Sequence, residues 1–122
     1  MENNLENRLI EYGVKVLLLK SSLDASWEAN HLYQQLFRSA TGVALNYAEA
    51  LGGESIKDFV HKLSICLKEL RESHVNLRLI EKGGLCPNTQ AMSELSNESN
   101  QLISILIKSI QTTKKNHPEM FK

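Results

Sequence analysis

Two short patterns in this chain have the spacing of metal ligands in di-metal helical proteins. Glu28 precedes His31 by three residues, and Asp58 precedes His61 by the same interval. In four-helix bundles that bind two metal ions, such pairs on two helices point into one shared core. Here each pair stands near the start of its predicted helix, and those two helices are expected to run antiparallel. The pairs would lie at opposite ends of the molecule, so we interpret them as surface polar residues and predict no metal site.

The sequence contains no motif of a covalent or phosphate-transferring enzyme. It has no Gly-x-Ser-x-Gly nucleophile elbow and no Gly-rich loop that would surround a phosphate. The spacing of Cys66, Cys86 and the four histidines supports neither a Cys–His pair nor a metal cluster. His74 falls beside an apolar stripe, which favours a hydrogen-bonded packing residue, and Trp27 is predicted to cover one end of the bundle. We therefore predict a non-enzymatic protein without a cofactor.

Cations on one side of the predicted third helix are the most informative pattern. At about 100° per residue they occupy an arc of roughly 100° that contains no acidic residue. Because phosphate attraction is local at physiological salt, a chain whose formal net charge is zero can still bind a polyanion along such an arc. The alternative is a solvated face whose charges pair with acids of a neighbouring helix. We call the candidate nucleic-acid-binding residues, which share the arc with His61, the basic strip: Lys57, Lys68, Arg71, Arg78 and Lys82.

A second group of polar residues follows the predicted second helix. Arg38, Asn46 and Glu49 share one side of it with Gly42, next to a stripe of alanines. A mid-helix glycine costs about 1 kcal/mol relative to alanine, so Gly42 is expected to permit a close backbone approach. Since buried polar groups need partners, the three polar residues form either a network between helices or subunits, or simply the exposed side of the helix. The sequence leaves both interpretations open.

Helical periodicity runs through the four segments that must position these residues. Apolar residues recur at helical spacing over about residues 4–21, 27–51, 55–82 and 89–114. Ser26 and Ser55 are expected N-caps, and the glycine pairs at 52–53 and 83–84 are expected helix stops. Short connections between long helices force antiparallel neighbours. We predict an all-α fold, an antiparallel up-down-up-down four-helix bundle that forms a single domain over residues 1–122.

The composition is that of an ordinary globular protein with no global preference for a charged partner. Apolar residues make up 42% of the chain, and 14 basic residues balance 14 acidic ones. The longest apolar runs are far shorter than the roughly 20 residues that cross a bilayer, so no membrane partner is expected. With two cysteines and no signal peptide, the expected location is a reducing cytoplasm.

Two of the predicted helices carry more apolar surface than one packing partner can cover. The first is apolar nearly all round between residues 16 and 19, and the fourth between residues 102 and 110. The two patches should lie toward opposite ends, where a head-to-tail contact between copies would bury both and close into a ring. The alternative is that both are broad core faces of a monomer. The predicted interface residues are Val16, Leu18, Leu19, Ile103, Ile105 and Ile107.

Residues 38–50, which read RSATGVALNYAEA, resemble the signature helix of the four-helix-bundle proteins encoded in 23S ribosomal RNA intervening sequences. The resemblance extends over nearly the whole chain in helix layout. Ala44 stands where the family frequently has proline, which predicts a straighter second helix here. The residues that carry most of the resemblance are Arg38, Asn46, Ala48, Glu49 and Phe59.

This resemblance implies a homopentameric, non-enzymatic bacterial protein. The family is also similar to the accessory protein of diversity-generating retroelements, which associates with nucleic acid and with a reverse transcriptase. Together with the basic strip, the resemblance predicts a cytoplasmic homo-oligomer, expected to be a pentamer, that binds structured RNA or other nucleic acid. The alternative function is a protein-interaction scaffold with no nucleic-acid role.

Overall fold

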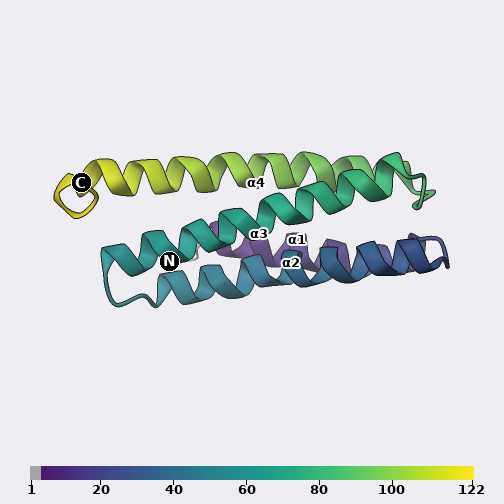
Figure 1. Ribbon diagram of the computed structural model, residues 1–122, viewed down its shortest axis with the longest axis horizontal. Helices are drawn as coiled ribbons and strands as arrows, with labels where there is room; N and C mark the ends of the chain where they lie inside the picture. Colours follow the sequence, from purple (N-terminus) through teal and green to yellow (C-terminus); the bar gives the residue numbers. More distant parts are fainter. Residues whose placement is uncertain (1–3) are drawn as a thin grey trace.

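Four long helices account for most of the chain in the computed structural model, which describes residues 4–122. They are α1 (Asn4–Leu19), α2 (Trp27–Leu51), α3 (Ile56–Lys82) and α4 (Thr89–Asn116), with short 3-10 helices η1 (Lys20–Ser22) and η2 (Pro118–Met120) after α1 and α4. Each long helix packs antiparallel against the one before it (Figure 1). The predicted all-α bundle with up-down-up-down order is confirmed, and the predicted bounds agree to within two residues.

Side-chain caps begin α2, α3 and α4. The hydroxyls of Ser26 and Ser55 each accept a hydrogen bond of 3.1 Å from the backbone N–H three residues later, and the side-chain oxygen of Asn88 does the same at the start of α4. Each such cap stabilises a helix by about 1 kcal/mol. After α3, Gly84 takes a φ of +68°, a left-handed conformation that favours glycine. Because these caps and this glycine end one helix and start the next within a few residues, the connections are short. Short connections place consecutive helices side by side.

A common core fills the space between the helices. Each long helix buries one stripe of apolar side chains, as its helical periodicity predicts. The largest side chains that are completely buried are Tyr12, Leu9, Leu36, Leu63, Leu70, Leu77, Ile80, Met92, Leu102 and Leu106.

A small polar network crosses this core and joins three helices. The Tyr12 hydroxyl of α1 hydrogen-bonds the Ser73 hydroxyl of α3, and burial raises the pKa of Tyr12 to about 12. At the next residue of α3, Nδ1 of His74 lies 2.6 Å from the Ser99 hydroxyl of α4, which also donates to the Ser96 carbonyl at 2.9 Å. The predicted role of His74 as a hydrogen-bonded packing residue is confirmed. Because a buried polar group without a partner is costly, this network fixes how α1, α3 and α4 align.

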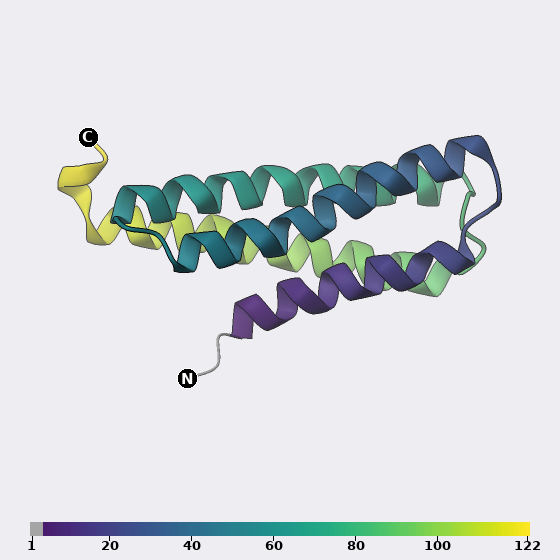
Figure 2. The same ribbon diagram turned by 90° about the horizontal axis from the view of Figure 1, so that it is seen from below.

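The first helix is much shorter than the others and covers only one half of the bundle. Its 16 residues span about 24 Å, whereas the 28 residues of α4 span about 42 Å. Figure 2 shows α1 beside the half of the bundle where α2 begins. Near its start, the Arg8 guanidinium pairs with the Glu98 carboxylate of α4 at 2.6 Å. Beyond this point α4 packs mainly on α3, and a row of its isoleucines remains half-buried: Ile103, Ile105, Ile107 and Ile110.

Trp27 does not cover the end of the bundle as predicted, because 73% of its surface is exposed. The inward positions of the first turns of α2 are taken by Ala29 and Tyr33, so position 27 faces outward. The bundle end is closed instead by the two loops that meet there, where the Asp24 N–H donates to the Leu85 carbonyl at 2.9 Å.

The structure also shows where the two cysteines lie and whether any helix could cross a membrane. Cys66 and Cys86 are free thiols buried in the protein, and burial raises the pKa of Cys66 to about 12. No helix between residues 4 and 122 is long and apolar enough to span a bilayer.

Candidate nucleic-acid interface

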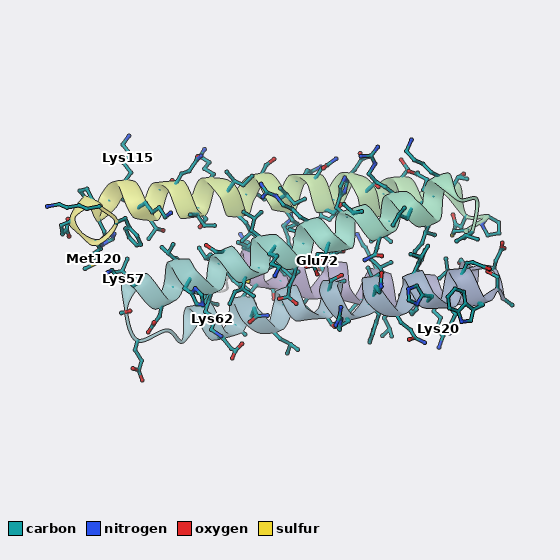
Figure 3. All side chains as sticks on the ribbon, in the orientation of Figure 1. Lys20, Lys57, Lys62, Glu72, Lys115 and Met120 are labelled. Atoms are coloured by element: carbon teal, nitrogen blue, oxygen red, sulfur yellow. The ribbon has the colours of Figure 1, made fainter. Side chains whose placement is uncertain are left out.

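The basic strip runs along the outer side of α3 and is open to solvent over its length. All five of its cations are exposed, as is His61. From Lys57 to Lys82 the strip is about 37 Å long, at 1.5 Å per residue. Figure 3 places Lys57 at the end of the bundle where Lys115 of α4 also lies. All five cations of the strip therefore belong to one helix, with intervals of 11 positions between Lys57 and Lys68 and 7 between Arg71 and Arg78.

The ion pairs found between residues 4 and 122 leave this strip free. They are Arg8 with Glu98, and Lys62 with Glu49. Within that part of the chain, none of the five strip cations lies within 4.0 Å of a carboxylate oxygen. The strip is thus the solvated face that the alternative interpretation expects, but within residues 4–122 its cations form no ion pair with acids of a neighbouring helix. Their positive charge remains available to a partner.

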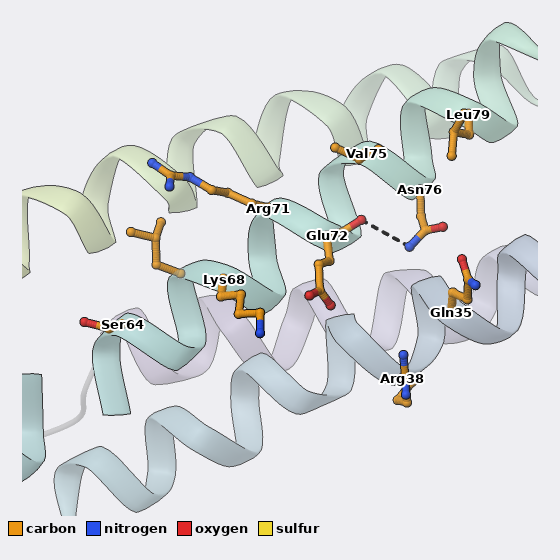
Figure 4. A pocket seen from close by; sticks show the side chains of 10 residues that line it. Gln35, Arg38, Ser64, Lys68, Arg71, Glu72, Val75, Asn76 and Leu79 are labelled. Atoms are coloured by element: carbon orange, nitrogen blue, oxygen red, sulfur yellow. Dashed lines mark hydrogen bonds between the residues drawn. The ribbon is translucent and has the colours of Figure 1, made fainter. Parts of the chain in front are cut away.

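A groove of about 690 Å³ lies between α2 and α3 beside the middle of the strip. Lys68 and Glu72 extend from α3 toward α2, from which Arg38 projects, while Arg71 extends on the other side of α3 (Figure 4). Three cations and one carboxylate line the groove, so its formal charge is 3 − 1 = +2. Two exposed aliphatic side chains, Val75 and Leu79, line it as well. The groove thus combines positive charge with apolar surface.

The polar stripe on α2 connects that helix to α3 within one chain. The Asn46 amide donates to the Glu69 carboxylate at 2.5 Å and to the Gly42 carbonyl at 3.0 Å. The Glu49 carboxylate lies 3.5 Å from the Lys62 ammonium. Asn46 therefore connects two helices, one of the two interpretations left open by the sequence, whereas Glu49 is exposed and makes its contact with Lys62 at the surface. Arg38 is exposed and lines the groove instead.

Gly42 makes room for the Glu69 carboxylate. A Cβ atom placed on Gly42 would lie only 2.0 Å from Oε2 of Glu69. The predicted close approach exists, but the approaching group is a side chain rather than a backbone. Burial raises the pKa of the Glu69 carboxyl, and the hydrogen bond from Asn46 opposes that rise. The signature helix therefore holds a partly desolvated carboxylate next to the positively charged groove.

Replacing Gly42 by alanine tests this arrangement. Gly42→Ala alone should change the free energy of unfolding little, because a gain of about 1 kcal/mol in helix propensity is offset by loss of the Asn46–Glu69 hydrogen bond. In a Glu69→Ala background no carboxylate is displaced, so the same substitution should stabilise the protein by about 1 kcal/mol. Urea unfolding of the four proteins measures the coupling. Equal effects in both backgrounds would contradict the placement of Glu69 over Gly42.

The two candidate metal-ligand pairs lie on the surface, near the starts of α2 and α3 at opposite ends of the bundle. His31 stacks on Trp27 and lies 3.4 Å from the Gln35 amide nitrogen. Residues 4–122 contain no group of three or more His, Cys, Asp or Glu side chains placed to hold a metal ion.

The predicted interface residues fall into three environments. Val16 and Leu19 are 0% and 3% exposed, so they are core residues and are not available to a second copy. Leu18 is 67% exposed, and the three isoleucines of α4 are half-buried. The inward face of α1 is set by Leu9 and Tyr12, which share a stripe with Val16 and Leu19.

The structure also has an apolar groove between α1 and α2, and none of the residues that line it was predicted as an interface residue. It has a volume of about 280 Å³, and Thr41 is the only polar side chain among the residues that line it. The spacing i, i+4, i+7 of the α1 members already marks a second apolar stripe on that helix. The large side chains that form this apolar patch are Ile10, Val14, Leu17, Phe37 and Leu45.

Comparison with known proteins places these features in a family context. The family model described as 23S rRNA-intervening sequence protein matches residues 2–108, which include the basic strip and both grooves. Among solved structures, the chain is similar to a protein of unknown function from the S23 ribosomal protein family of Bacteroides thetaiotaomicron VPI-5482. The two are 27% identical, with a TM-score of 0.75, over 87% of this chain and 97% of the other. No protein of curated function matches the chain.

Proposed function

Because this chain belongs to the 23S rRNA-intervening sequence protein family, we propose that it is a non-enzymatic protein that binds RNA or DNA through the basic strip of α3. The observation that supports this function best is the row of five exposed cations that have no carboxylate partner among residues 4–122. Cations that are already paired gain little from a phosphate, whereas these five lose no ion pair on binding one. Arg38, in the adjacent groove, adds a sixth positive charge from α2.

Salt dependence tests this function. If the five strip cations contact phosphates, the logarithm of the binding constant should fall with the logarithm of salt concentration with a slope of about −3.5 for single strands and −4.5 for a duplex, which is five times the per-phosphate values. Fluorescence anisotropy of a labelled RNA hairpin, titrated at several salt concentrations, measures this slope. A slope near zero, or no binding at low salt, would contradict the proposed function.

We also propose that the protein acts as a homo-oligomer, for which the family resemblance implies five copies. The apolar patch between α1 and α2 supports assembly, because contiguous exposed apolar surface on a protein commonly marks an interface. In a ring, each copy would contribute one basic strip, and several strips binding one polyanion would act together. Assembly would thus raise the affinity of a chain whose formal net charge is zero.

Light scattering tests the assembly. Five copies of the 13.8 kDa chain would have a mass of about 69 kDa, since 5 × 13.8 = 69. Leu17→Asp with Leu45→Asp should release monomers, because both side chains are about half or more exposed in the apolar patch. Leu51→Asp, which changes an exposed leucine outside that patch, serves as the control. A native mass of 13.8 kDa at high concentration would rule out assembly.

A protein-interaction scaffold is the second candidate function. Val75 and Leu79 are 54% and 51% exposed beside the cations of the α2–α3 groove, and aliphatic side chains contribute little to phosphate binding. A partner protein that covers both would bind with weak salt dependence, in contrast to nucleic acid. A reverse transcriptase is the partner to test first, on the resemblance to the retroelement accessory protein.

A further inference from the structure

Trp27 and His31 form an exposed stacked pair at the start of α2. Their ring centroids are 5.2 Å apart, and the ring planes differ by 9°. Although the imidazole covers one face of the indole, 73% of Trp27 remains accessible to solvent. Most of the indole is therefore open to solvent. An indole held flat by a neighbouring ring is a preformed stacking surface, and it loses little freedom when a second ring is added.

A hollow of about 420 Å³ lies next to this pair, and Trp27 forms part of its wall. The hollow is lined by polar groups of different kinds, including the Lys20 ammonium, the Asp24 carboxylate and the Asn30 amide. Its apolar lining includes Tyr33, whose hydroxyl donates to the Val16 carbonyl at 3.1 Å and is thereby fixed. The volume is suited to a small planar group. Amide and carboxylate groups can hydrogen-bond a base edge, and an ammonium can pair with a phosphate.

The stacked pair is also linked to the positively charged groove. His31 contacts Gln35 at 3.4 Å, and Gln35 lines the α2–α3 groove together with Arg38 and Lys68. From Trp27 to Arg38 the distance along α2 is about 16 Å. Residues 27, 31, 35 and 38 fall within an arc of about 80° on that helix. One continuous face of α2 therefore leads from an aromatic surface to a groove with a formal charge of +2.

We propose that this face binds a single-stranded segment of nucleic acid, with an unpaired base stacked on Trp27 and the neighbouring phosphates on Lys20 and on the cations of the α2–α3 groove. This proposal rests on the proposed nucleic-acid-binding function and specifies its ligand. The interior base pairs of a duplex cannot make the contact, because their bases are already stacked on both faces. An aromatic surface next to a positively charged groove is the arrangement that single-strand binding requires.

The chain has a single tryptophan, so its tryptophan fluorescence, excited selectively over that of the three tyrosines, reports on Trp27 alone. The probes are an unpaired RNA of about 12 nucleotides, a DNA of the same sequence and the corresponding RNA duplex. The single-stranded RNA should quench the fluorescence of the full-length protein, and the duplex should not. If the DNA also quenches the fluorescence, the protein recognises the base and the phosphate alone. If only the RNA does, the protein also recognises the 2′-hydroxyl group.

Substitution then measures the contribution of the ring to binding. Trp27→Ala should weaken binding of the single-stranded RNA about tenfold, since loss of one stacked base has an effect of that order. Trp27→Phe should restore most of the affinity, and Leu51→Ala, which removes an exposed apolar side chain from the other end of α2, should have no effect. The exposure of Trp27 means that its removal should leave the fold intact, which circular dichroism verifies.

The outcomes separate this proposal from the proposed function. If Trp27→Ala binds single-stranded RNA as tightly as the native protein, while binding still weakens steeply with salt, the stacking site is refuted and the basic strip is retained. If Trp27→Ala instead lowers the mass in light scattering with RNA affinity unchanged, the indole contacts a second copy and the proposal is likewise refuted. If no probe binds the native protein at low salt, both proposals fail.

Discussion

Replacing Lys68, Arg71 and Arg78 together by glutamate is expected to weaken RNA binding by about 100-fold or more near 0.1 M salt. Three of the five strip cations would become repulsive, including both that line the α2–α3 groove. All three side chains are exposed and take part in no ion pair within the described residues, so the fold should be retained. Anisotropy titration of the variant and the native protein with the same RNA hairpin measures the loss.

A second triple variant controls for the change in overall charge. Lys15, Lys108 and Lys115 are exposed and lie on α1 and α4 rather than on α3, with Lys115 at the end of the bundle where Lys57 also lies. Changing these three to glutamate alters the net charge by the same −6, because each substitution contributes −2. If binding depends on the strip, this control should lose far less affinity than the first variant. Equal losses would show that only the total charge matters, and the strip would not be a site.

Tyr12→Ala is expected to lower the free energy of unfolding by about 3–5 kcal/mol. Tyr12 is completely buried, and its ring is the largest side chain that α1 places in the core. Its removal leaves a cavity and takes away the hydrogen bond to Ser73. Because α1 is short and has few other large contacts with α3 and α4, much of its attachment depends on this residue. Urea unfolding monitored by circular dichroism measures the change.

Two further variants separate the ring from the hydroxyl. Tyr12→Phe keeps the packing and removes the hydrogen bond, so a loss of about 1 kcal/mol is expected. Leu18→Ala, on the exposed side of the same helix, should change the stability by less than about 0.5 kcal/mol. A loss below about 1 kcal/mol for Tyr12→Ala would mean that α1 is not held in the core as the structure shows.

The helices could be predicted because their signals are local. Ser26, Ser55 and the glycine pairs bracket apolar periodicities that are long enough to identify without tertiary information. The basic strip could also be predicted, since all its members share one helix and their relative directions follow from 100° per residue. Short loops then determined the order of packing. These features need no knowledge of which helices face each other.

Features that depend on two or more helices could not be predicted in the same way. The periodicity of α1 groups Val16 with Leu9 and Tyr12 on one stripe, but because that helix is apolar almost all round, it did not show whether the neighbouring stripe with Val14 would be covered as well. The α2–α3 groove forms because Arg38 and Lys68, which are 30 positions apart in the sequence, lie on facing helices. Trp27 was assigned to the bundle end because it is a large apolar residue at the start of its helix, but the loops already fill that space.

The short first helix makes the two ends of the molecule mechanically different. Where α1 is present, each core side chain is surrounded by neighbours on every side, and opening that end must break contacts among four helices at once. Where α1 is absent, only three helices hold together, so transient fraying of the bundle is concentrated there. The stiff end carries Trp27 and its hollow, and the softer end carries Lys57. A ligand that lies along the whole rod would therefore meet a rigid anchor at one extremity and an adaptable surface at the other.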